Sequence, residues 1–74
     1  DAVRRGLDES FADIEAAKRI DRLTLHYYGG KLRVELLLPL DVLGKGATAD
    51  ALSRRFNDAV QNDPQIASVE LRFH

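Results

Sequence analysis

The fold is decided by the stretch from Leu23 to Leu38, which reads Leu-Thr-Leu-His-Tyr-Tyr-Gly-Gly-Lys-Leu-Arg-Val-Glu-Leu-Leu-Leu. Apolar and polar side chains alternate on both sides of Gly29-Gly30, which is the period of a half-buried β-strand. A pair of glycines is typical of a tight hairpin turn, because the central residues of such a turn need positive φ. The stretch therefore predicts two antiparallel strands. Pro39, which cannot donate a ladder hydrogen bond, predicts the end of the second strand.

Residues 2–20, on the N-terminal side of the hairpin, are predicted to form an amphipathic helix. Apolar side chains recur there at spacings of four, four and three residues, at Val3, Leu7, Phe11 and Ile14. These positions share one face of a helix. Gly6 weakens the first turn by about 1 kcal/mol relative to alanine. We therefore expect the helix to be firm only from about Leu7, with Asp8 as its cap.

A loop, a second helix and a third strand are predicted on the C-terminal side of the hairpin. Residues 41–47 contain two glycines and indicate a mobile loop. Thr48 is a suitable cap for the helix that follows, which is expected to end at Asn62-Asp63-Pro64. The apolar face of this helix comprises Leu52, Phe56, Ala59 and Val60. Alternation at Val69, Leu71 and Phe73 predicts the closing strand.

The order helix, strand, strand, helix, strand predicts an α+β fold. We expect a two-layer sandwich in which both helices cover one face of a three-stranded mixed sheet. The other face would stay uncovered and offer a surface for a partner. The residues expected on it are Thr24, His26, Tyr28, Arg33, Glu35, Leu37, Glu70, Arg72 and His74.

Length and composition exclude several classes of protein. A chain of 74 residues is expected to be a single domain, spanning residues 1–74. Its small core is expected to give the fold only a low stability. Oligomerisation is the favoured support, because the chain has no cysteine for disulfides or thiolate zinc sites. A net charge of −1 argues against a nucleic-acid partner. The absence of an initiator methionine suggests a piece of a longer protein, and no apolar run is long enough to span a membrane, so the piece itself is expected to be soluble.

The chain offers little chemistry for catalysis, and we expect no enzyme activity. Its serines lie in no nucleophile motif, and Gly44-Lys45-Gly46 lacks the spacing of a phosphate-binding loop. The candidate metal ligands are His26 and His74, since imidazole binds zinc and similar cations. A structural zinc site normally has four ligands, so two histidines on a solvated sheet face remain the simpler interpretation.

Three segments resemble the C-terminal cytoplasmic domain of cation diffusion facilitator transporters. The segment from Ile20 to Gly30 resembles the family's first strand, Val-x-x-Val followed by glycine, and residues 34–41 resemble its second, which ends in an acidic residue. The segment from Pro64 to His74 resembles the closing strand, Pro-x-Val followed by Val-x-Val-His-x-Glu.

The resemblance implies a metallochaperone-like, ferredoxin-like domain that forms a homodimer on the cytoplasmic face of a membrane. It would regulate the transmembrane domain of the same chain, which exports zinc, iron, manganese or a similar divalent cation. No small-molecule substrate is implied. The family's metal-site histidines are replaced here by Thr24, Leu37, Arg72 and Asp50, while His74 stands at a position that is usually acidic. Metal sensing is therefore expected to be weak or altered, with any zinc held loosely by His74 or His26. Leu37, Arg72 and His74 are expected at the dimer interface.

Two other interpretations remain open at the level of sequence. One is a free-standing ferredoxin-like module that binds a small ligand or another protein, suggested by the uncovered sheet face and the glycines before Thr48. The other is a small structural subunit without a ligand.

Overall fold

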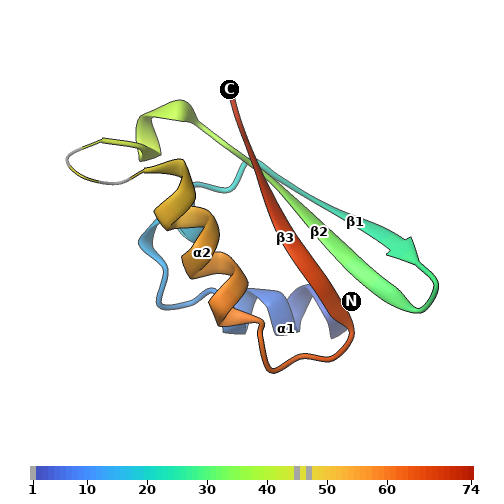
Figure 1. The fold of residues 1–74 in the computed structure, drawn as a ribbon. Helices are drawn as coiled ribbons and strands as arrows, with labels where there is room; N and C mark the ends of the chain where they lie inside the picture. Colours follow the sequence, from blue (N-terminus) through green and yellow to red (C-terminus); the bar gives the residue numbers. More distant parts are fainter. Residues whose placement is uncertain (1, 45, 47) are drawn as a thin grey trace.

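The computed structural model describes residues 2–44, 46 and 48–74 (Figure 1). Its elements, in chain order, are α1 (Ala2–Ser10), the 3₁₀ helix η1 (Glu15–Arg19), β1 (Arg22–Tyr28), β2 (Lys31–Leu38), the 3₁₀ helix η2 (Leu40–Val42), α2 (Ala49–Ala59) and β3 (Ile66–Phe73). The predicted order of helix, strand, strand, helix and strand is confirmed. Lys45 and Ala47 of the predicted loop lie outside the described residues.

The three strands form one open sheet with β2 in the centre. β1 pairs with β2 in the antiparallel sense and β2 pairs with β3 in the parallel sense, so the sheet is mixed as expected. The hairpin turn has Gly29 at φ 47° and Gly30 at φ 86°. This backbone explains the glycine pair, since positive φ is strained for residues that carry a Cβ.

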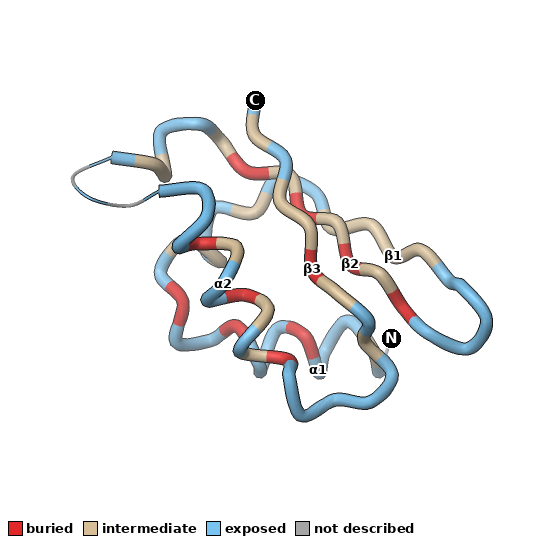
Figure 2. The backbone as a smooth tube through the Cα atoms, in the orientation of Figure 1, coloured by how far each residue is buried: buried red, intermediate tan, exposed pale blue. Residues whose placement is uncertain are grey.

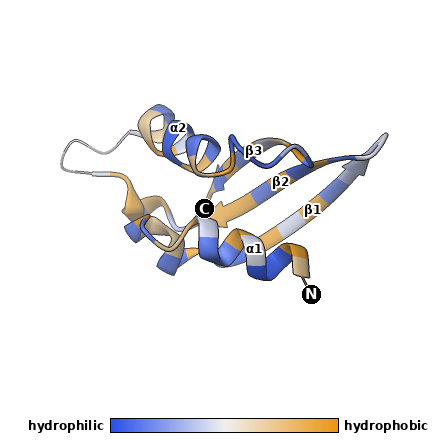
Figure 3. Cartoon of the chain, turned by 90° about the horizontal axis from the view of Figure 1, so that it is seen from below, coloured by the Kyte–Doolittle hydropathy of each residue, from blue (hydrophilic) through white to orange (hydrophobic). Residues whose placement is uncertain are grey.

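Both helices pack on one face of the sheet and enclose the core between the layers (Figures 2 and 3). The core contains Leu7 and Phe11 from the N-terminal segment, Phe56 from α2, and the alternate residues of β2, such as Val34 and Leu36. Phe11 and Phe56 meet edge to face with their ring centroids 4.9 Å apart. The two-layer α+β sandwich is confirmed, and none of the helices formed by the described residues covers the opposite sheet face.

The first helix is shorter than the sequence pattern predicts. α1 ends at Ser10, and residues 11–13 form a turn before η1. Ile14 has an extended backbone (φ −97°, ψ 116°), which redirects the chain while its side chain stays 4% exposed in the core. The predicted apolar positions Leu7, Phe11 and Ile14 are all buried, although the helix ends before the last two of them. The expectation about Gly6 is wrong, because α1 runs through it from Ala2, and Asp8 lies inside the helix.

The second helix and third strand are tied together by one side chain. The amide of Asn57 donates to the carbonyl of Val69 at 3.0 Å and accepts from its N–H at 2.9 Å. β3 begins at Ile66, earlier than the alternation predicts, and its register shifts by one residue between Leu32 and Arg33. Thr48 caps α2 as predicted by accepting a hydrogen bond from the N–H of Ala51 at 3.1 Å.

Candidate functional site

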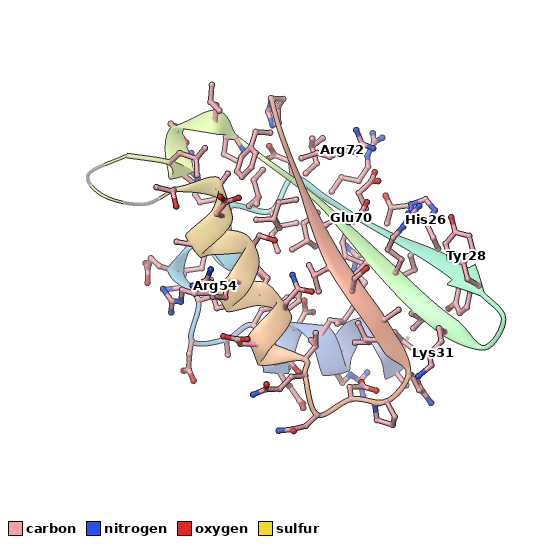
Figure 4. The ribbon with its side chains drawn as sticks, in the orientation of Figure 1. His26, Tyr28, Lys31, Arg54, Glu70 and Arg72 are labelled. Atoms are coloured by element: carbon pink, nitrogen blue, oxygen red, sulfur yellow. The ribbon has the colours of Figure 1, made fainter. Side chains whose placement is uncertain are left out.

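The uncovered side of the sheet, here called the open face, is the candidate site. It is built from alternate residues of all three strands, and Figure 4 shows His26, Tyr28, Glu70 and Arg72 on the side away from α2. The residues expected on this face from the sequence lie on it wherever the strand register defines their position. The face consists of Arg22, Thr24, His26, Tyr28, Lys31, Arg33, Glu35, Leu37, Ser68, Glu70 and Arg72.

The strand register arranges these residues in rows that cross the sheet. The first row is Arg22, Leu37 and Arg72; the second is Thr24, Glu35 and Glu70; the third is His26, Arg33 and Ser68. Successive rows are two residues apart along each strand, about 6.6 Å. A row that holds two carboxylates therefore lies between two rows that hold arginines.

Glu35 is the centre of this arrangement, because basic groups from both neighbouring strands approach one of its oxygens. The Nε of Arg72 lies 3.1 Å from Oε2 of Glu35, and the Nε2 of His26 lies 3.8 Å from the same oxygen. The Glu35 side chain is 24% exposed, against 66% for Arg72. His26 Nε2 is itself covered and has no hydrogen-bond partner among the described residues. The carboxylate is thus already balanced by a fixed guanidinium.

Arg33 occupies the third row and contacts two strands. Its Nη2 donates to the hydroxyl of Tyr28 at 3.0 Å, and its guanidinium carbon lies 5.1 Å from the centroid of that ring. On the other side its Nη1 lies 3.6 Å from Oε1 of Glu70. Arg33 is therefore committed to partners on β1 and β3, and it holds the tyrosine ring against the sheet.

His74 belongs to a different cluster. It follows β3, and its Nε2 contacts the carboxylate of Asp21 just before β1. His26 pairs across the hairpin with Arg33, whereas the residue before His74 pairs with Leu38, so more than about 15 Å of strand separates the two histidines. The structure does not bring the two predicted metal ligands together.

The open face does not have the donor set of a metal centre. Among residues 2–44, 46 and 48–74, no three His, Asp or Glu side chains are grouped so that they could hold an ion. His26 and Glu35 form a ligand-like pair on this face, and Arg72 contacts that same carboxylate. Two unit charges of like sign at 4 Å repel by about 1 kcal/mol in water and by more where water is excluded. The sequence indicated the loss of ligands, but not the ion pair that replaces them, because that pair joins β2 to β3.

Leu37 lies in the first row between Arg22 and Arg72, and it is half-buried although no helix covers it. An apolar side chain in the middle of a charged sheet face suits contact with another protein surface.

Comparison with known proteins gives a match at the level of structure. No family model and no curated protein matches the sequence. Solved structures of the MamM C-terminal domain match over the whole chain: one has 14% identity and a TM-score of 0.71, covering 99% of this chain and 94% of that chain. A cadmium form has 15% identity and a TM-score of 0.72 with 100% and 94% covered, and a zinc form has 14% and 0.70 with 99% and 81% covered.

The two-layer fold with its uncovered sheet face is ferredoxin-like and is the fold of a C-terminal domain of a cation diffusion facilitator transporter. The particular relative in the matching structures is MamM, a member of that family. The resemblance stated from the sequence is confirmed for the fold. None of the helices in the described part of the chain has the length and apolar character needed to cross a bilayer.

Proposed function

We propose that this chain is the homodimerising cytoplasmic regulatory domain of a divalent-cation efflux transporter, with an altered metal-sensing site. Its partners are a second copy and the transmembrane domain of the same transporter chain, and its role is assembly and regulation rather than catalysis. The fold, matched over 99% of the chain by a cation diffusion facilitator domain, supports this proposal.

The observation that carries the proposal is the ion pair between Arg72 and Glu35 on an uncovered sheet face. Arg72 stands where the family's closing strand has a histidine, and it supplies a permanent positive charge 3.1 Å from a carboxylate. A guanidinium stays protonated at any physiological pH, so this charge needs no bound cation. The dimer contacts are assigned to Leu37, Arg72 and His74, and zinc bound by His26 or His74 would be weak.

The main alternative is a free-standing module that binds a small ligand. A depression between α1 and η1, lined by Phe11, Ile14 and Ala17, is the observation that bears on it, and its volume is 220 Å³. Sites that bury a drug-sized ligand occupy roughly 300–1,000 Å³. The depression is smaller than such sites and is open to solvent, so the protein-contact role is favoured.

Sedimentation equilibrium of the purified domain at tens of micromolar tests the proposal. We expect a dimer that is unchanged by excess EDTA and by equimolar zinc. Leu37→Asp introduces a charge at the centre of the open face and should shift the protein to monomer. Ala51→Asp is the matched control, because it adds the same charge at an exposed position on α2, away from the open face.

A wild-type monomer at this concentration would overturn the dimer proposal. A dimer that forms only with zinc, with a stoichiometric micromolar site abolished by His74→Ala or His26→Ala, would overturn the altered-sensing part and leave the dimer standing.

A further inference from the structure

The alternation of charge along the open face decides how a second copy can dock, and the inference below rests on the proposed homodimer. The acidic row, with Glu35 and Glu70, is flanked by a row with Arg22 and Arg72 and by a row with Arg33. A surface that meets its own copy must be self-complementary under a two-fold rotation. Because rows of opposite charge alternate along the face, only some two-fold axes bring opposite charges together.

A two-fold axis parallel to the strands would set each row against its own copy, so Arg72 and Arg22 would meet arginines and the carboxylates would meet carboxylates. An axis that crosses the strands, midway between the first and second rows, sets the arginine row of each copy against the acidic row of the other. Arg72 then faces Glu70 of the second copy, and the reciprocal pair forms at the same time. The two Leu37 side chains lie close to this axis.

We propose that two copies dock through their open faces in this register, with reciprocal ion pairs between Arg72 of each copy and Glu70 of the other holding the interface where a metal is not available. The exposure of these side chains supports the choice. Arg72 is 66% exposed and Glu70 is 44% exposed. Arg72 contacts Glu35 through Nε, and a guanidinium carries five donors in all, so its terminal nitrogens are not needed for this pair.

If the two-fold axis lay midway between the second and third rows, Arg33 would instead face Glu35 of the second copy. These two groups are less accessible, at 33% and 24% exposed. Arg33 is also engaged by the Tyr28 hydroxyl at 3.0 Å and by the face of that ring. Breaking those contacts would cost binding free energy, so the register through Arg72 and Glu70 is favoured.

The experiment uses two charge reversals that are each unfavourable alone and complementary together. Arg72→Glu places carboxylates on both sides of the proposed pair in a homodimer, and Glu70→Arg places guanidinium groups on both sides. Each variant alone should dimerise on the order of 100-fold more weakly than wild type, because like charges across an interface are disfavoured. An equimolar mixture restores both opposite-charge pairs and should form a heterodimer with affinity near that of wild type.

Mixing changes no contact inside either copy, so recovery in the mixture reports contacts between copies only. Circular dichroism of each variant confirms that it is folded, and a fluorescent label on one variant lets sedimentation velocity detect the heterodimer. Wild-type dimerisation should also weaken by about tenfold between low and 0.5 M salt, since these pairs lie at a partly solvated surface.

A mixture that stays monomeric while wild type dimerises would overturn this register and leave the proposed homodimer intact. Recovery only in a mixture of Arg33→Glu and Glu35→Arg would place the axis one row further along and also overturn it. If the wild-type protein is monomeric even in the absence of salt, the proposed homodimer itself is contradicted.

Discussion

The Nε of Arg72 on β3 lies 3.1 Å from the carboxylate of Glu35 on β2, and the imidazole of His26 on β1 approaches the same oxygen at 3.8 Å. One side chain from each strand therefore meets at a single point of the open face. Because the arginine is the only member that cannot ligate a cation, its replacement is a direct test of the site.

Arg72→His should give the domain tighter zinc binding than the wild type. The substitution removes the permanent charge and supplies a third ligand beside His26 and Glu35, which is the minimum for a protein zinc site with one open position. We expect zinc affinity at least about tenfold above that of Arg72→Gln, which removes the charge without adding a ligand. Isothermal titration with zinc measures both. Equal affinity in the two variants would show that charge alone excludes the metal.

Asn57→Ala should destabilise the fold by about 2 kcal/mol. The mutation removes a reciprocal pair of hydrogen bonds to the backbone of Val69, at 3.0 and 2.9 Å, and each such bond contributes about 1 kcal/mol. Urea denaturation followed by circular dichroism gives the free energy of unfolding. Asn62→Ala, in the exposed turn after α2, is the control and should change it by less than about 0.5 kcal/mol. Equal effects would contradict a bridging role for Asn57.

Phe56→Ala should unfold most of the protein at 25 °C. Phe56 is fully buried and packs edge to face on Phe11, and truncation of such a residue costs about 3–5 kcal/mol. That cost equals the whole stability expected of a domain this small. Phe56→Leu keeps most of the volume and should remain folded with a lower melting temperature. A cooperative thermal transition for the alanine variant close to that of wild type would show that the core tolerates the cavity.

Two glycine substitutions should change stability in opposite directions. Gly30→Ala places a Cβ on a residue at φ 86° and should destabilise the hairpin by about 1–2 kcal/mol. Gly6→Ala lies in α1, where the new Cβ meets nothing within 4 Å beyond its own helix, and it should stabilise by up to about 1 kcal/mol. Thermal melts of both variants against wild type measure the signs. A stabilising effect at position 30 would contradict the observed turn.

The hairpin and the second helix could be predicted because their signals are local. A glycine pair between alternating strands needs only its own backbone preference, and Thr48 caps α2 through an atom three residues away. The first helix was predicted with the right buried residues but the wrong length. Phe11 and Ile14 keep a helical spacing because they fill the same core, and the turn between them is imposed by the path back to β1.

The candidate site was predicted as a surface and not as a set of contacts. Alternation assigned Glu35, Arg72 and His26 to one sheet face, since successive side chains on a strand point to opposite sides. It also paired His26 with His74 as candidate ligands, whereas the strand register separates them and gives His74 a partner in Asp21. Distances between strands depend on register, and register is set by the packing of the whole sheet.

The sequence by itself determined the order of elements, the apolar side of each one and the presence of an uncovered polar sheet face, because periodicity and glycine positions act over a few residues. Only the tertiary structure decided which charges meet on that face. The Arg72–Glu35 pair joins residues far apart in the chain, and it exists because β3 lies parallel to β2 in one register. That register places a fixed guanidinium beside the carboxylate, and Coulomb repulsion between the guanidinium and a cation opposes metal binding at this point.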